Sequence, residues 1–234
     1  MKRYMGVLVL LAVLTAGCSG HNDQAVTKQH EASHAQTEVI AQSQDQSVRV
    51  KANTSVTGDM LQGLTVQIGE QERSFPWSNV SNPTYYPEVR LANVDADAES
   101  EVLIILTTAY GTGVRQAELH VLNKDFTELD VDNPTDAVKS HIRTSHAIAG
   151  DKHTYSVTVD NHTYTKSYSK AEAGQWFEDV VIGNITTYRV QGQSIVVELS
   201  AQVSPGTFMG TVVAEYEVRG DRLAIGRVAF REGD

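Results

Sequence analysis

Hydrophobic and polar residues alternate along much of the chain after residue 47, which is the pattern of β-strands with one buried face. In residues 48–51 and again in residues 64–68, every second residue is aliphatic and its neighbours are polar. Gly69-Glu70-Gln71 then predicts a turn, and residues 73–77 predict a returning strand. The pattern therefore begins with an antiparallel hairpin.

Further along, two more strand pairs are predicted. Residues 101–107 form a continuous apolar run, which is typical of a strand buried on both faces. A turn over residues 110–114 leads from this strand to another over 116–122. A hairpin is predicted over residues 155–166, because Asp and Asn at Asp160-Asn161 tolerate the left-handed backbone of a tight turn.

The C-terminal part predicts an antiparallel meander, because its strand patterns are separated by short segments that contain glycine. The four predicted strands cover residues 185–190, 194–202, 207–218 and 222–230. The fold class is therefore mainly β, or β-rich α+β, with antiparallel hairpins, a C-terminal meander and one or two short helices. We expect one globular domain over residues 48–234, and the alternative is a division near residues 130–150.

Residues 133–138 predict the start of a helix, because an Asn cap, a Pro in the first turn and an Asp near the positive end of the helix dipole follow in order. Val138 and Ile142 are four residues apart on one helical face, which predicts a helix that ends before Gly150. A second, shorter helical turn is predicted over residues 170–174.

The N-terminus has the features of a secretory signal peptide. Lys2 and Arg3 precede an apolar run over residues 5–14, and small residues follow it up to Cys18. Residues 14–18, Leu-Thr-Ala-Gly-Cys, resemble the lipobox of bacterial lipoproteins. The resemblance implies that residues 1–17 are removed and that the thiol of Cys18 carries the lipid, with palmitate-type acyl chains. The protein is then expected at the extracytoplasmic face of a bacterial cell membrane, and the alternative is a soluble secreted protein with an incidental cysteine.

Residues 18–47 are predicted to be a flexible tether, because they contain no aromatic residue and many polar ones. Within them, His30-Glu31-Ala32-Ser33-His34 matches the H-E-x-x-H pattern of zinc metalloproteases. In those enzymes the two imidazoles bind zinc from one face of a buried helix, whereas the flanks here are polar. We interpret the segment as solvated tether, and the alternatives are a protease or a weak zinc site that includes His21.

Composition excludes some classes of function. Acidic residues outnumber basic ones and the formal charge is -10, which argues against nucleic acid as a partner, because phosphate binding needs clustered cations. Apolar residues make up 41% of the chain, enough for an ordinary core. The single cysteine excludes an internal disulfide.

An acidic segment over residues 93–101 precedes the predicted buried strand. Oxygen side chains at alternate positions let a short loop wrap a calcium ion, which takes six to eight oxygen ligands. The segment resembles the calcium loops of FG-GAP and VCBS-type repeats. The resemblance implies ligand positions at Asn93, Asp95, Asp97 and Glu101, with the backbone carbonyl of Glu99. Asn93 replaces the usual aspartate and Ala98 the usual glycine. The predicted role of calcium is structural, and the alternative is a degenerate loop whose acidic side chains are only solvated.

The sequence offers little catalytic chemistry. It contains no G-x-S-x-G motif, and lipid on Cys18 would remove the only cysteine nucleophile. Ser140-His141 and Ser145-His146 are adjacent pairs that we interpret as surface residues of the predicted helix. Glu178-Asp179 has the chemistry of a glycosidase carboxylate pair, but a chain with 29 acidic residues contains many such pairs by chance.

Tyr85, Tyr86 and Trp176 are the residues that suggest a ligand platform. We therefore expect a membrane-anchored, non-catalytic binding module for an unknown protein or cell-wall ligand, stabilised by calcium. The alternative is an extracytoplasmic hydrolase that uses a carboxylate pair or, as a zinc protease, His30, Glu31 and His34.

Overall fold

The computed structural model describes residues 37–55, 58–95 and 99–233, which belong to one compact unit. The fold is mainly β, with antiparallel sheets and a C-terminal meander, which confirms the predicted fold class. Lys2, Cys18, His30, His34 and the rest of the predicted leader and tether up to residue 36 lie outside the described residues.

Two small sheets come first in the chain. A four-stranded sheet has the order β1-β2-β4-β5, formed by β1 (Thr37–Gln42), β2 (Val48–Asn53), β4 (Thr65–Ile68) and β5 (Gln71–Ser74). A two-stranded sheet pairs β3 (Met60–Gln62) with β6 (Ser78–Val80). A 3-10 turn, η1 (Pro83–Tyr85), then leads to the main sheet. The hairpin predicted from the alternation is β4–β5, and its turn is shorter by one residue than the sequence suggests.

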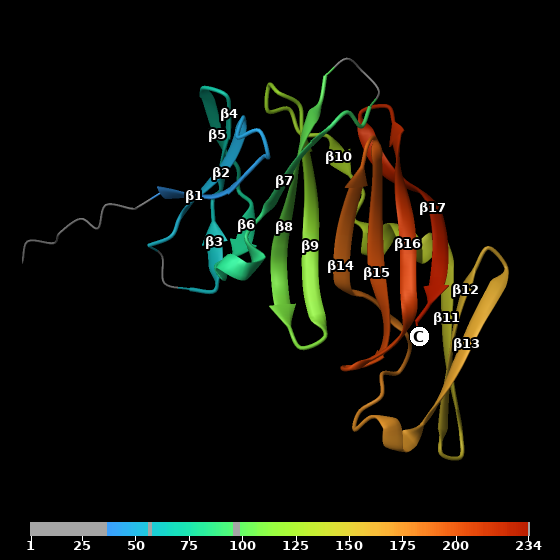
Figure 1. Cartoon of the computed structure of the whole chain (residues 1–234). Helices are drawn as coiled ribbons and strands as arrows, with labels where there is room; N and C mark the ends of the chain where they lie inside the picture. The colour runs from blue at the N-terminus through green and yellow to red at the C-terminus, as the bar shows by residue number, and fades with distance from the viewer. Residues whose placement is uncertain (1–36, 56–57, 96–98, 234) are drawn as a thin grey trace, which may run out of the picture. The chain divides into compact units, whose positions relative to one another are not determined.

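The main sheet has eight strands in the order β10-β17-β16-β15-β14-β9-β8-β7. Its members are β7 (Glu88–Ala92), β8 (Glu101–Gly111), β9 (Val114–Leu122), β10 (Asp130–Val131), β14 (Val181–Gln191), β15 (Ser194–Ser204), β16 (Thr207–Arg219) and β17 (Arg222–Glu232). β14 to β17 are the predicted meander and lie side by side in Figure 1. A single register pair, Ile185 with Arg115, joins the meander to the β8–β9 hairpin.

A three-stranded sheet completes the fold. It consists of β11 (Ile142–Ala149), β12 (Lys152–Val159) and β13 (His162–Ser169), and η3 (Lys170–Glu172) follows it. The predicted turn at Asp160 and Asn161 is confirmed, with φ angles of 46° and 65°. These positive values explain why Asp and Asn occupy the turn. The predicted helical turn near residue 170 is also confirmed, as η3 with a capping box made by Ser169 and Glu172.

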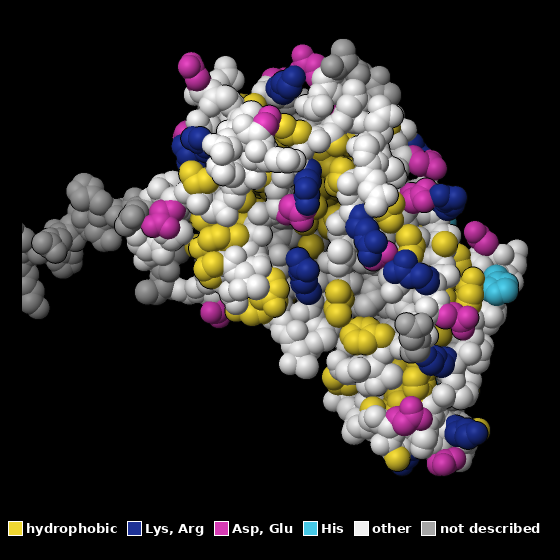
Figure 2. All heavy atoms as spheres, in the orientation of Figure 1, with side chains coloured by type: hydrophobic (Ala, Val, Ile, Leu, Met, Phe, Trp, Pro, Cys, Tyr) yellow, Lys and Arg dark blue, Asp and Glu magenta, His cyan; other side chains and the backbone are white. Residues whose placement is uncertain are grey.

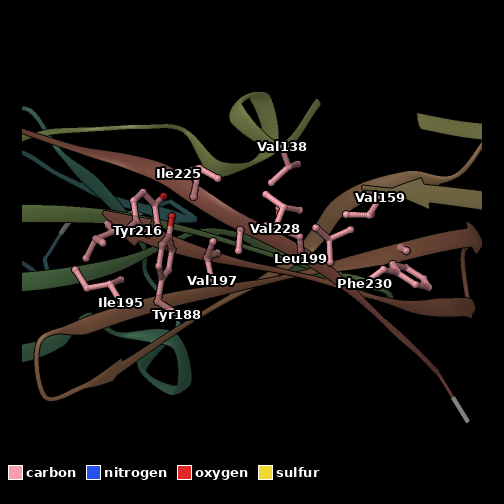
Figure 3. Close-up of a cluster of buried hydrophobic side chains, with 14 of the residues drawn as sticks. Val138, Val159, Tyr188, Ile195, Val197, Leu199, Tyr216, Ile225, Val228 and Phe230 are labelled. Carbon is pink, nitrogen blue, oxygen red and sulfur yellow. The ribbon is translucent and has the colours of Figure 1, made fainter. Parts of the chain in front are cut away.

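Two hydrophobic cores lie on opposite faces of β8. The first core packs the meander and the three-stranded sheet against one face, and Leu103 is its member from β8. Figure 3 shows part of this core, where Val138 of the helical turn and Val159 of β12 point toward Val228 and Leu199. The second core packs the two N-terminal sheets against the other face through Val102, Ile104 and Leu106, among others. The prediction that this strand is buried on both faces is confirmed.

The helix predicted to reach toward Gly150 is wrong beyond its first turns. Only α1 (Pro134–Ala137) and η2 (Val138–Ser140) are helical, and Asn133 accepts a hydrogen bond from the backbone of Asp136 as predicted. Ile142 instead begins β11, because the segment pairs along its whole length with β12. Strand pairing therefore outweighs the four-residue spacing of Val138 and Ile142.

Ordered strand structure begins earlier in the chain than residue 48. β1 lies inside the segment predicted as tether, where only Ile40 is buried, and its backbone pairing with β2 makes it a strand. Val138, Tyr155 and Leu199, which lie within and beyond the alternative division near residues 130–150, belong to the same core. Among the described residues, no helix is long and apolar enough to cross a membrane.

The shared strand gives a direct test of the core assignment. Leu103→Ala should lower the free energy of unfolding by about 2–5 kcal/mol, because the side chain is fully buried in the first core. Ile148→Ala, at an exposed position of β11, should change it by less than about 0.5 kcal/mol. Urea unfolding followed by circular dichroism measures both. Equal effects of the two substitutions would contradict the assignment.

Candidate functional site

An open groove of about 1110 Å³ runs along β7. It is lined by residues 41–45, at the end of β1 and the start of the turn that follows, and by residues 87–92, which include all of β7. Val190 of β14 and Gly192 of the turn after it complete the lining. Figure 2 shows acidic and basic side chains interspersed across the middle of one face, between areas where hydrophobic side chains gather.

β7 is the edge strand of the eight-stranded sheet. It pairs with β8 from Glu88 opposite Ile105 to Ala92 opposite Glu101, and no other strand among the described residues pairs with it. Val89 and Ala92 are buried in the cores, whereas Leu91 is 40% exposed. The opposite edge of the sheet, β10, is only two residues long. β7 is therefore the longer free edge of this sheet, and it borders the groove.

The β1–β2 turn forms a polar wall that is braced internally. The carboxylate of Asp45 accepts hydrogen bonds from the hydroxyl of Ser43 at 2.6 Å and from the backbone N–H of Ser47 at 3.1 Å. These bonds, with that of Ser43 strongest, hold the pKa of Asp45 below its usual value. Across the groove, Arg90 forms an ion pair with Glu88. The groove thus presents both signs of charge.

The predicted aromatic residues do not form one platform. The rings of Tyr85 and Tyr110 are 4.6 Å apart, and the guanidinium of Arg115 lies 5.8 Å from the centre of the Tyr85 ring. Tyr86, which follows η1, packs against the second core. Tyr110 was missed by the sequence analysis, although Tyr110 and Arg115 are register partners that flank a glycine-containing turn.

Trp176 belongs to a different cluster from the two tyrosines. Its ring lies 4.9 Å from that of His153, and its indole N–H donates to the carbonyl of Lys170 at 3.2 Å. Ser145 and His146 lie on β11, so their side chains point to opposite faces of a strand and not along a helix. One oxygen of Asp179 accepts from the hydroxyl of Thr144 at 2.8 Å, so this member of the predicted carboxylate pair has a structural contact.

The acidic loop joins β7 to β8. Glu101 is only 2% exposed, and its carboxylate accepts the backbone N–H of Val94 at 2.7 Å, which closes the loop at its base. The carboxylate of Glu99 forms an ion pair with Lys124, with 3.3 Å between the carboxylate oxygen and the ammonium nitrogen. Asn93 and Asp95 are half-buried, and Asp97 lies outside the described residues.

Two of the predicted ligand residues are therefore engaged within the protein, the Glu101 carboxylate by the backbone of Val94 and the Glu99 carboxylate by Lys124. Within the ranges that the structure describes, no three His, Cys, Asp or Glu side chains are grouped closely enough to hold a metal ion. Calcium binding stays a prediction. His30 and His34, the histidines of the alternative zinc site, are outside the described residues.

A scan against protein-family models, a search of curated proteins and a search of solved structures each found no match to this chain. The function proposed below is therefore argued from the sequence and from the geometry of the groove.

Thermal unfolding with calcium and then with EGTA tests the loop. A hundredfold excess of calcium over its Kd adds about 2.7 kcal/mol to the free energy of unfolding, and we expect the midpoint to rise by several degrees. Asp95→Ala should abolish the rise, because it removes a predicted ligand. Asp221→Ala, in the turn between β16 and β17, should retain it. A midpoint that does not respond to calcium in the unsubstituted chain would refute the site.

Proposed function

We propose that this chain is a membrane-anchored extracytoplasmic lipoprotein whose β domain is a non-catalytic binding module, and that its ligand is an extended peptide segment of a partner protein. The peptide would bind along β7 as an added strand. The observation that carries this proposal is the position of β7, which is a free sheet edge among the described strands and borders a groove of about 1110 Å³. An extended peptide is the ligand that the backbone N–H and C=O groups of a sheet edge recognise.

The dimensions of β7 set the length of peptide that the groove accommodates. Its five residues extend over about 17 Å, so the bound segment would contain about five or six residues. Main-chain hydrogen bonds to the edge would supply affinity, and the side chains along the groove would supply specificity. An edge strand with charged residues is also a common protection against aggregation, but the accompanying groove leaves space for an added strand.

The side chains of the groove favour a particular peptide composition. Leu91 offers an exposed apolar contact in the groove. Glu88 and Arg90 neutralise each other, whereas Asp45, which also lines the groove, forms no ion pair with a Lys or Arg among the described residues. We therefore expect an apolar residue against Leu91 and a basic residue near Asp45.

Calcium would act on the same site. The loop that would hold it, through Asn93, Asp95, Asp97, Glu101 and the carbonyl of Glu99, connects the end of β7 to the start of β8. When bound, the ion supplies a positive centre that draws these oxygens together. The edge strand would then be held at its C-terminal end, which lowers the entropy lost when a peptide binds.

Groove filling tests the peptide site. Phage display of random 12-residue peptides against the full chain should enrich a sequence set, and the best peptide is then measured by fluorescence polarisation. Gln42→Trp should weaken its binding at least tenfold, because residue 42 is exposed and lines the groove, so an indole there occupies the peptide's space.

Gln71→Trp is the matched control, because Gln71 is equally exposed but lies on β5 at the far edge of the N-terminal sheet. This variant should bind the peptide with unchanged affinity. Failure to enrich any peptide, or equal affinity of the two tryptophan variants, would count against the groove. Binding of purified cell-wall glycan that Gln42→Trp abolishes would replace the peptide with a wall ligand.

Metabolic labelling tests the anchor. In bacteria fed alkyne-palmitate, the chain should carry label and sediment with membranes, and Cys18→Ala should lose both properties. Cys18 is the only cysteine, so the thiol has no competitor within the chain. An unlabelled chain in the soluble fraction would contradict lipidation, and label that persists in Cys18→Ala would place the lipid elsewhere.

A further inference from the structure

Two histidines on neighbouring strands face each other through one ring nitrogen each. Nε2 of His146 on β11 lies 3.0 Å from Nδ1 of His153 on β12. The two ring planes differ by only 12°, and the ring centres are 5.1 Å apart. Because the ring centres are farther apart than the two nitrogens, the nitrogens lie between the rings and point toward each other. The contact is therefore a hydrogen bond in which one proton lies between two imidazoles.

The surrounding acceptor determines which nitrogens carry protons. Nδ1 of His146 lies 3.1 Å from the carbonyl oxygen of Glu178, and a carbonyl accepts hydrogen bonds only. His146 therefore carries its proton on Nδ1, and its Nε2 is an acceptor when the ring is neutral. The bond between the rings must then be donated by the Nδ1–H of His153. His153 therefore donates a hydrogen bond to His146, and His146 donates one to the backbone carbonyl of Glu178.

This pair holds the strap segment, residues 170–180, which connects β13 to β14. The hydroxyl of Tyr155 donates to the carbonyl of Phe177 at 2.6 Å, and the ring of His146 stacks on that of Tyr155 at 4.0 Å. The ring of Trp176 covers His153 on the other side. The two histidines therefore lie within the contact between the three-stranded sheet and the strap segment.

The groups around the two histidines do little to stabilise a positive charge on either imidazole. His153 is 8% exposed, and this burial lowers its pKa, with smaller contributions from His146 and from Lys170 of η3. Tyr155 of β12 and Tyr168 of β13 have raised pKa values, the latter about 12, so both are neutral.

The nearby carboxylates do not contact the rings. The charge of Glu172 of η3 contributes to the raised pKa of Tyr168, and that of Asp179 contributes to the raised pKa of Tyr155. Asp179 also accepts a hydrogen bond from the hydroxyl of Thr144. Glu178 contacts the pair through its carbonyl. Across the described part of the chain, neither imidazole has a hydrogen bond or an ion pair to a carboxylate.

We propose that His146 and His153 form an acid-sensitive latch that releases the strap segment when both rings become protonated. One added proton, on either ring, leaves a single N–H between the two facing nitrogens, so the bond between the rings remains. Two added protons leave an N–H on both facing nitrogens, and these meet head to head. The bond is then lost, and two adjacent cations repel each other. Release uncovers Tyr155 and Tyr168 of the first core.

The direction of the pH effect follows from His153. Its pKa in the folded protein lies below the unfolded value of 6.5, so the unfolded or released form binds the proton more tightly. Closure of the strap segment is thus unaffected above pH 6.5 and weakens progressively as the pH falls below it. The full chain at neutral pH is the closed form.

Hydrogen exchange of the full chain, followed by mass spectrometry and corrected for intrinsic rates, tests the latch. Protection of residues 170–180 should fall at least tenfold between pH 7.5 and pH 4.5, while the β14–β17 meander stays protected. His146→Gln should weaken this pH dependence, because its amide oxygen accepts the His153 N–H and no second cation can form beside His153. His162→Gln, on β13 in the same sheet, should behave as the unsubstituted chain.

The same pH dependence in His146→Gln, or flat protection in the unsubstituted chain, would overturn the proposal. Imidazole titration by NMR of the unsubstituted chain provides a second measurement if His146→Gln fails to fold. The titration of His153 is expected below pH 6.5, together with the loss of protection. A titration of His153 that leaves the strap segment protected would also overturn the proposal.

Discussion

The structure depends on a single strand, β8, that is buried on both faces. Leu103 faces the core shared by the meander and the three-stranded sheet, whereas Val102, Ile104 and Leu106 face the core beneath the N-terminal sheets. Because successive side chains of a strand point to opposite faces, apolar residues at consecutive positions serve both cores at once. Neither core can therefore form completely without this strand, and its place sets those of β7 and β9 beside it.

The two features that we connect with function lie on elements attached to this framework in different ways. β7 is held by backbone pairing along one side only, so its other edge remains available within the described strands. The His146–His153 pair lies where the three-stranded sheet meets the strap segment, and that sheet joins the rest of the fold by side-chain packing in the first core. Peptide binding at β7 and proton binding at the His146–His153 pair would thus alter separate contacts.

Local chemistry explains the elements that were predicted correctly. The turn at Asp160 and Asn161 needs left-handed backbone that these residue types tolerate, and the Asn133 cap needs only its own side chain and the next turn. The helix failed beyond residue 140 because β11 gains its backbone hydrogen bonds from β12, which outweighs a helical spacing of two apolar residues. β1 was missed for the same reason, since one buried residue gives no pattern but five of its six residues pair with β2.

The β-rich class, the hairpins and the buried strand could be predicted from the sequence, because they depend on residues that are neighbours along the chain. Which distant residues meet depends on the tertiary fold. Tyr85 meets Tyr110 only because η1 lies against the end of β8, and His146 meets His153 only because a segment with helical spacing becomes a strand. The free edge of β7 is likewise a property of strand order, which arises from pairing between segments far apart in the chain.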